Sequence, residues 1–228
     1  MVDRFFEITK TFEKTQSSPE TDALFFSKVA QKAQETDGYY TATSSTTYTK
    51  SNVFDLLKKF LSTGKLRRYK AQGALIMYVS SHIMDLLETS TAFTRKIEMT
   101  QISEGGTGIE TRITDIDGVP VMEVIDDERF YDKFNFDSDN GGFEPVAKNE
   151  DEGITGSHKI NVLIASPLTT KIVPKISSIY SFAPGSHTEG DGWLYQNRSL
   201  MDVFTFPNGK DGKIDSIYVD VDTTEYTE

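Results

Sequence analysis

The sequence contains no cysteine and only three histidines among its 228 residues. Without cysteine, the chain has no disulfide framework, no thiolate nucleophile and no cysteine-rich zinc site. The histidines are His82, His158 and His187, and no two of them have the spacing of three or four residues that places two metal ligands on one helix face. We therefore expect neither a bound metal nor a cofactor.

Motifs that mark common catalytic sites are also missing. There is no G-x-S-x-G sequence for a serine nucleophile, and the Gly-Lys pairs, such as Gly64-Lys65, are not followed by the Ser or Thr of a phosphate-binding loop. The glycine-rich residues 105–108 precede a predicted strand and not a helix, which favours a hairpin turn over a phosphate site. The sequence thus predicts a protein that is not an enzyme.

Long apolar runs and a surplus of positive charge are missing as well. No stretch of about 18 apolar residues is present. Asp3, Arg4 and Glu7 interrupt the N-terminal region where a signal peptide would be apolar. We therefore expect no membrane-spanning segment and no secretion signal. The net charge of −11 disfavours binding to nucleic acid through overall electrostatics.

The composition, with 37% hydrophobic and 26% charged residues, is that of a folded globular chain. Two helices are predicted in its first third. Residues 17–35 begin with Ser-Ser-Pro, which suits a helix start, and continue with apolar residues at helical spacing. Residues 51–61 predict a second amphipathic helix that ends before Gly64. Between them, residues 39–49 predict a strand or an extended connector.

Strands are predicted in the middle of the chain. Residues 74–79 form a short apolar run that precedes a brief helix. Residues 95–124 alternate between apolar and polar positions around glycine-containing turns, as in antiparallel hairpins. Residues 130–156 are acidic, glycine-rich and aperiodic, which predicts a long surface excursion.

The C-terminal part of the chain carries three further predictions. Residues 160–165 indicate a buried strand. Residues 166–167, a Ser-Pro pair, indicate the start of a helix that Pro174 would kink or end. Residues 199–206 and 213–221 then predict two strands that close the chain as a β-hairpin.

Two acidic segments partly match cation-binding loops. Residues 211–215 match the middle of an EF-hand loop, but Pro207, Gly209 and Tyr218 stand where that loop needs acidic ligands. Residues 137–142 could bind a cation through carboxylates and amides, although acidic loops are usually just solvated. The second segment leaves a cation-dependent binding module open as an alternative function.

One basic patch stands out in this acidic chain. It comprises Lys58, Lys59, Lys65, Arg67, Arg68 and Lys70. Three interpretations of it stay open. It is a solvated helix end whose cations the helix dipole favours, a contact for the acidic surface of a neighbouring copy, or a nucleic-acid contact.

The order of these segments, together with three local sequences, resembles that of the major capsid proteins of tailed bacteriophages, which share the Hong Kong phage coat fold. Residues 74–87 resemble the family's apolar strand that runs into a short helix. Residues 116–121 are similar to its Gly-x-Pro-Val strand. Residues 191–206 resemble the segment in which coat proteins of Gram-positive phages return to the peripheral domain. The order of the segments across nearly the whole chain carries the resemblance.

The resemblance implies an α+β fold with two domains. The peripheral domain would consist of a long spine helix and a β-hairpin, and the axial domain of a mixed sheet flanked by short helices. Residues 1–70 would form the first part of the peripheral domain, residues 71–190 the axial domain, and residues 191–228 the return to the peripheral domain. Family members usually have an N-terminal arm and an extended loop before the spine helix, and most of both are missing from residues 1–16.

The implied function is that of a structural subunit of a phage or prophage capsid shell. Such a major capsid protein self-assembles into pentamers and hexamers around packaged DNA. Its expected partners are further copies of itself and, by resemblance, scaffold and portal proteins, with at most non-specific contacts to DNA and none to a membrane. It would lie in the virion capsid and, during assembly, in the cytoplasm of the host bacterium. The candidate subunit contacts are Lys65, Arg67, Arg68, Lys70, Trp193, Tyr195 and Arg198.

A second shell function is an alternative. Bacterial encapsulin-type nanocompartments enclose cargo in a shell whose subunits share the coat fold. The resemblance in segment order applies to both kinds of shell, so the sequence leaves both open.

Overall fold

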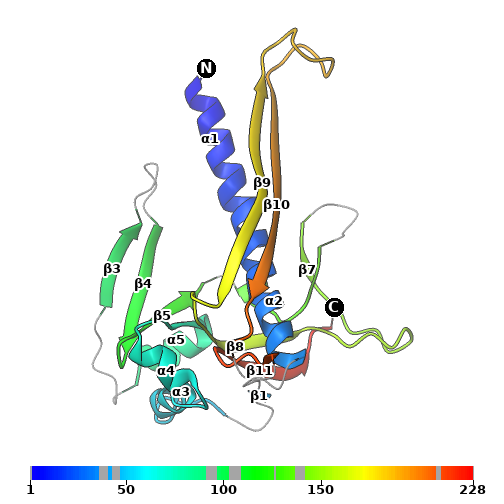
Figure 1. Ribbon diagram of the computed structural model, residues 1–228. Helices are drawn as coiled ribbons and strands as arrows, with labels where there is room; N and C mark the ends of the chain where they lie inside the picture. Colours follow the sequence, from blue (N-terminus) through cyan, green and yellow to red (C-terminus); the bar gives the residue numbers. More distant parts are fainter. Residues whose placement is uncertain are drawn as a thin grey trace.

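The computed structural model describes residues 2–35, 41–42, 47–90, 97–102, 109–125, 127–136, 142–208 and 212–227. They form a seven-stranded main sheet with helices on both faces. A long helix and a long β-hairpin project from this body in the same direction (Figure 1). The mixture of helices and strands confirms the predicted α+β class, and the coat fold itself stays a prediction.

The main sheet combines parallel and antiparallel pairs. In spatial order its strands are β1 (Thr41–Ala42), β11 (Ile217–Glu225), β8 (His158–Ala165), β2 (Ile76–Ser80), β5 (Val119–Val124), β4 (Ile109–Ile116) and β3 (Ile97–Ile102). β2 lies at the centre, parallel to β5 and antiparallel to β8. The neighbours β3, β4 and β5 are antiparallel, which confirms the hairpins predicted for residues 95–124.

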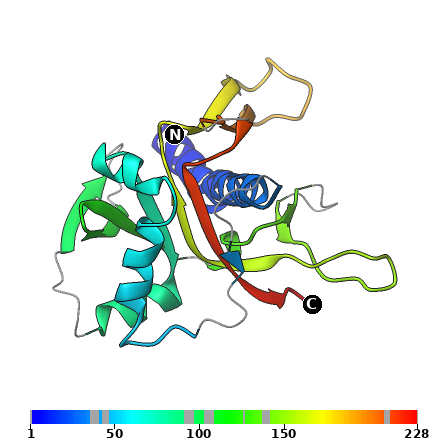
Figure 2. The ribbon, with the colours of Figure 1, turned by 60° about the horizontal axis from the view of Figure 1, so that its bottom comes forward.

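Alternating residues of the central strands form two hydrophobic cores. On β8, Val162 and Ile164 pack with α3 (Val53–Leu61), α4 (Leu66–Ala71) and α5 (Ser81–Glu88) on one face of the sheet. Leu163 packs with α2 (Ser18–Glu35) on the other face. Figure 2 shows the two groups of helices on opposite sides of β8 and β11. Because successive side chains of a strand point to opposite faces, one strand serves both cores.

The predicted second and third helices are confirmed, and the first begins earlier than predicted. α2 continues a helix that starts with α1 (Val2–Phe12), and the two are joined by a π-helical turn, η1 (Glu13–Ser17). The prediction that the helix starts at residue 17 is therefore wrong. A proline ring inside a helix clashes with the carbonyl of the preceding turn. The wide turn η1 lies just before Pro19 and leaves room for this ring, so the helix continues through the proline instead of starting there.

The prediction of a helix that starts at residues 166–167 is wrong. Residues 166–169 form a tight turn in which the Ser166 carbonyl accepts hydrogen bonds from the N–H groups of Thr169 and Thr170, at 3.1 and 2.9 Å. The chain then continues as β9 (Thr170–Phe182). This segment is rich in β-branched and aromatic residues, which favour a strand. Pro174 pairs with Met201 beside a register shift, where a strand tolerates a residue without an N–H group.

The predicted closing hairpin is also wrong. β10 (Leu194–Thr205) pairs along its whole length with β9, and β11 pairs with β8 and β1 in the main sheet. The two predicted strands are therefore present but belong to different sheets. Because β9 forms where a helix was predicted, β10 finds its partner on its N-terminal side. The predicted domain boundary after residue 190 falls in the loop between β9 and β10.

Residues 130–156 are only partly a surface excursion. The described part contains two short strands, β6 (Phe134–Asn135) and β7 (Glu144–Pro145), after a 3-10 turn, η2 (Asp127–Arg129). Phe130 and Asp132 are fully buried. The Phe130 ring meets that of Phe26 edge to face, with centroids 4.8 Å apart, and so helps to hold α2 on the sheet. The prediction of a surface excursion is wrong for these residues.

Candidate functional site

The predicted basic patch lies on the last turn of α3 and on α4, and we call its six residues the α4 patch. They are Lys58, Lys59, Lys65, Arg67, Arg68 and Lys70. Two carboxylates from elsewhere in the chain pair with four of its six cations, Lys58, Lys65, Arg68 and Lys70.

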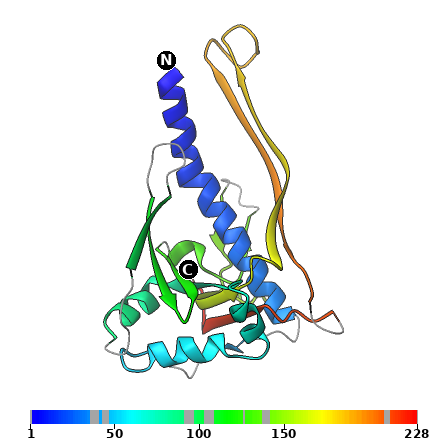
Figure 3. The same ribbon diagram turned by 60° about the vertical axis from the view of Figure 1, so that its left-hand side comes forward.

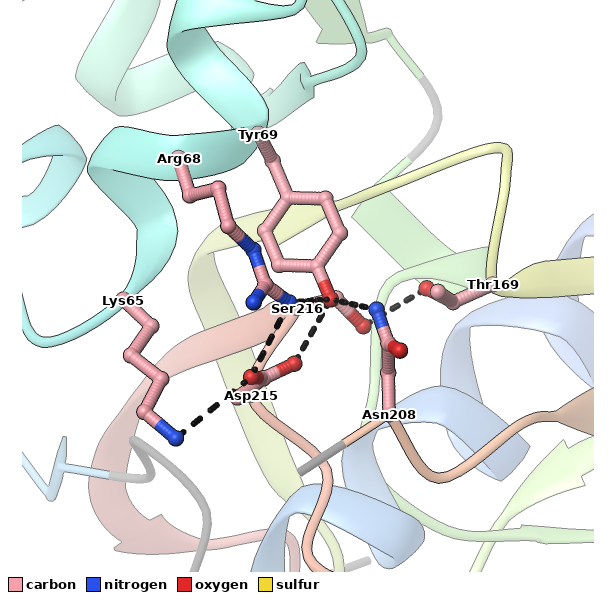
Figure 4. A network of polar contacts seen from close by, with 7 residues as sticks. All are labelled: Lys65, Arg68, Tyr69, Thr169, Asn208, Asp215 and Ser216. Carbon is pink, nitrogen blue, oxygen red and sulfur yellow. Dashed lines mark hydrogen bonds and ion pairs between the residues drawn. The ribbon is translucent and has the colours of Figure 1, made fainter. Parts of the chain in front are cut away.

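The first carboxylate is Asp215, which lies just before β11 and is only 3% exposed. The Tyr69 hydroxyl donates a 2.6 Å hydrogen bond to its Oδ1. The Arg68 guanidinium and the Lys65 ammonium approach its Oδ2 at 3.4 and 3.8 Å. The Asn208 amide donates in turn to the Tyr69 hydroxyl (Figure 4). A buried carboxylate is costly unless it is paired and hydrogen-bonded, so this network ties α4 to the end of the hairpin and to β11.

The second carboxylate is Asp117, in the turn between β4 and β5. Its φ of 52°, with Gly118 next to it at 80°, gives the two-residue Asp-Gly turn typical of a tight hairpin. Lys70 binds the Asp117 carboxylate at 3.0 Å and Lys58 approaches it at 3.6 Å. The hydrogen bond from Lys70, helped by the charge of Lys58, lowers the pKa of Asp117 below its ordinary value.

A cavity of about 510 Å³ opens beside the buried network. Its walls come from three segments: α4, the turn before β9 and the residues after β10. Leu168 and Phe206 are 58% and 51% exposed at this place, and Arg68 also lines it. We call it the base pocket, because it lies at the foot of the β9–β10 hairpin. It combines apolar side chains, a cation and amide groups.

The β9–β10 hairpin is the second notable surface. It is a two-stranded sheet of its own, and it projects well beyond the main sheet (Figure 3). Near its foot, one face of β10 meets α2: the Thr21 hydroxyl lies 3.6 Å from the Met201 sulfur, and Val203 packs against the buried cluster on that side. In the described residues no third strand pairs with the hairpin.

Large apolar side chains line the outer part of the hairpin. Leu200 alternates with Met201 on β10 and so points to the face opposite α2. Ile176 is paired with Leu200, and Tyr180 lies on the same face four residues along β9. All three are exposed. We call Ile176, Tyr180 and Leu200 the hairpin stripe. The Ser178–Arg198 pair lies between Tyr180 and the other two residues on this face. Large apolar side chains that stay exposed on one face are a feature of protein–protein contacts.

The loop at the hairpin tip is closed by its own hydrogen bonds. The Glu189 N–H donates to Nδ1 of His187, and Nε2 of His187 donates to the Gly192 carbonyl at 2.7 Å. The two bonds join residues 187, 189 and 192 across the loop. Trp193, the single tryptophan of the chain, is 56% exposed at the end of this loop. A large aromatic side chain on a closed loop is a good anchor for a partner.

The candidate contacts predicted from the sequence thus fall into two groups. Lys65, Arg67, Arg68 and Lys70 lie on the α4 patch, and Trp193, Tyr195 and Arg198 lie on the outer hairpin. Within one chain the structure does not bring the two groups together. We did not predict from the sequence that Asp215 and Asp117 pair with the basic residues, or that the hairpin stripe is exposed. Burial and strand pairing leave no local pattern in the sequence.

The other candidate sites gain no support. The described residues contain no group of three or more His, Asp or Glu side chains that could hold a metal ion. Residues 137–141 of the acidic segment and the glycine-rich residues 105–108 lie outside the described residues. Within the described part of the chain, no helix is long and apolar enough to cross a membrane.

Comparisons with protein families and with curated proteins add no identification. No family model matches the chain, and no curated protein matches it.

Proposed function

We propose that this protein is a structural, non-enzymatic subunit that associates with further copies of itself through the β9–β10 hairpin. The hairpin stripe carries this proposal. An isolated two-stranded hairpin is at best marginally stable in water, and its open edges and apolar side chains invite pairing with another chain. A hairpin with twelve paired positions and exposed Ile176, Tyr180 and Leu200 is therefore best explained as one half of an interface.

The narrower proposal is that the copies form a tailed-phage capsid shell, with the partners and location that the resemblance implies. The three local sequences support it, as does the segment order up to β8, whereas the helix after β8 and the closing hairpin that belong to this order are not formed. A long helix and an extended hairpin, which such subunits use to reach their neighbours, also support it. In this chain the hairpin spans residues 170–205 and follows the long helix, whereas the resemblance places an extended loop before that helix. Electron microscopy of assembled protein tests this narrower proposal, because closed shells support it and open filaments oppose it.

The self-association itself is tested by Ile176→Thr with Leu200→Thr. Threonine keeps the strand propensity but removes the apolar contact. Burying each side chain contributes about 1 kcal/mol or more, so the double variant should associate at least roughly tenfold more weakly. Sedimentation velocity over a concentration series measures the change.

Ile125→Thr is the matched control. Ile125 is 70% exposed, lies after β5 and is not part of the hairpin. Its replacement makes the same chemical change elsewhere and should leave association unchanged. A wild-type protein that sediments as a monomer at every concentration would contradict the proposed function.

A further inference from the structure

We infer that the hairpin tip of one copy docks on the α4 patch and base pocket of a neighbouring copy. This inference rests on the proposed self-association and names the two surfaces that meet. By the tip we mean residues 183–193, which connect β9 to β10.

The two surfaces lie at opposite ends of the same hairpin. Thr170 and Thr205 form the last pair at its foot, and the Phe206 N–H donates to the Thr169 carbonyl at 2.8 Å in the wall of the base pocket. Twelve paired positions at about 3.3 Å each place the tip roughly 40 Å from the foot. A tip therefore cannot reach the pocket of its own chain, so a contact between them joins two copies.

Charge complementarity favours this pairing. The tip contains Glu189 and Asp191 and no Lys or Arg. The α4 patch has six cations against the two carboxylates of Asp117 and Asp215, which leaves a clear positive excess. Lys65 and Arg68 stay about half exposed although they pair with Asp215. Opposite potentials steer such surfaces together and select their register.

Shape and chemistry favour it as well. The base pocket, at about 510 Å³, has room for the indole ring of Trp193. Exposed Leu168 and Phe206 supply apolar contacts, and Arg68 supplies a cation that binds well over an indole face. A buried aromatic anchor inside a charged rim is the usual arrangement of a strong interface. The contact joins two different surfaces, so it either closes reciprocally in a two-fold dimer or continues head-to-tail into a ring or an open chain.

Crosslinking tests the contact directly, because the chain has no cysteine of its own. Asp191→Cys and Gln72→Cys place single thiols on the exposed tip and on the pocket wall. The two variants, mixed and treated with a short bismaleimide, should give a mixed dimer, and each alone should give little product. Glu152→Cys, on an exposed loop elsewhere, is the control partner for Asp191→Cys and should give only background. Crosslinking of Asp191→Cys to itself would overturn the inference in favour of a tip-to-tip contact.

A complementation experiment separates this inference from the proposed function. A tip variant, Glu189→Lys with Asp191→Lys, and a pocket variant, Arg68→Gln with Gln72→Glu, should each associate at least tenfold more weakly. Their mixture should recover one contact per pair and sediment as a 1:1 dimer. Circular dichroism checks that both variants fold. If both variants still assemble like the wild type while Ile176→Thr with Leu200→Thr does not, self-association stands and the tip-to-pocket contact is wrong.

Discussion

At the scale of a single residue, Asp220 is completely buried but only partly hydrogen-bonded. It lies on β11 next to β1, where the Tyr48 hydroxyl donates to its Oδ2 and Asn161 also hydrogen-bonds to it. Its Oδ1 has no hydrogen-bond partner among the described residues. Burial is the main reason that the pKa of Asp220 is raised from 3.8 to about 7, against the effect of these hydrogen bonds. The side chain of Asp222 adds a smaller like-charge effect in the same direction.

The raised pKa predicts how stability depends on pH. Between about pH 4 and about pH 7 the folded protein holds a proton that the unfolded chain has released, so its free energy of unfolding falls as the pH rises through this range. The contribution of protonated Asp220 to the free energy of unfolding is fully present below about pH 4 and lost above about pH 7. It amounts to about 4 kcal/mol at most. Asp220→Asn keeps the group neutral and of similar size, so this variant should lose less stability over the same range. Urea unfolding followed by circular dichroism measures both curves.

Asp151→Asn is the control for that experiment, because Asp151 is exposed and its replacement should leave the pH dependence unchanged. Parallel curves for the wild type and Asp220→Asn would show that another group causes the pH dependence.

At the scale of elements, the outer hairpin should contribute to association and little to the stability of the body. Its foot contacts α2 through Met201 and Val203, whereas the part beyond the Ile176–Leu200 pair has no contact with either hydrophobic core. Replacing residues 177–199 with Asn-Gly joins this pair by a two-residue turn suited to a hairpin. The shortened protein should keep its melting temperature within a few degrees and lose association. Differential scanning calorimetry and sedimentation measure the two effects.

The corresponding control replaces residues 184–191 alone with a short Gly-Ser linker, which removes most of the tip but keeps the strands. It should weaken association through the tip and leave the hairpin stripe in place. A large fall in melting temperature for the shortened hairpin would show that the outer strands stabilise the body after all.

At the scale of the whole molecule, the two hydrophobic cores share one sheet and should unfold together. Val162 of β8 belongs to the first core and Leu163, its neighbour, to the second. The sheet also draws its strands from all three of the predicted segments, 1–70, 71–190 and 191–228. Loss of either core would therefore expose the strands that support the other, which predicts one cooperative transition.

Two signals test this cooperativity. Far-ultraviolet and near-ultraviolet circular dichroism should give coincident urea transitions, because buried tyrosines such as Tyr69 and Tyr218 report on the first core. At concentrations where the protein is a monomer, the fluorescence of Trp193 should change little in that transition, since this residue is exposed at the hairpin tip of a single chain. Two separate transitions would show that the cores are independently stable.

Much of the local structure could be predicted from the sequence. α3, with Val53, Leu57 and Leu61 buried on one face, follows from helical spacing, and β2 and β8 follow from short apolar runs. The Asp117-Gly118 turn follows from its two residue types. These features depend on residues close together in the chain, so their physical causes are visible in the sequence.

The same local rules fail where distant residues decide the structure. Ser-Pro pairs suit a helix start, yet residues 18–19 lie inside a helix and residues 166–167 lead into a strand. The sequence predicted which residues could form contacts. It did not predict that they lie on two separate surfaces, the α4 patch and the hairpin tip. That separation depends on the pairing of β10 with β9, which no local pattern specifies.

The sequence by itself determined the absence of cysteine and hence of thiol chemistry, the α+β class, and the position of most strands. Only the tertiary structure decided which strands pair, which carboxylates are buried and which apolar side chains stay exposed. An alternating pattern shows that a segment needs a partner strand, but the partner is chosen by the packing of the whole chain. Asp215 and Ile176 illustrate this, because the acid is buried against Tyr69 and the isoleucine is left in solvent on the hairpin stripe.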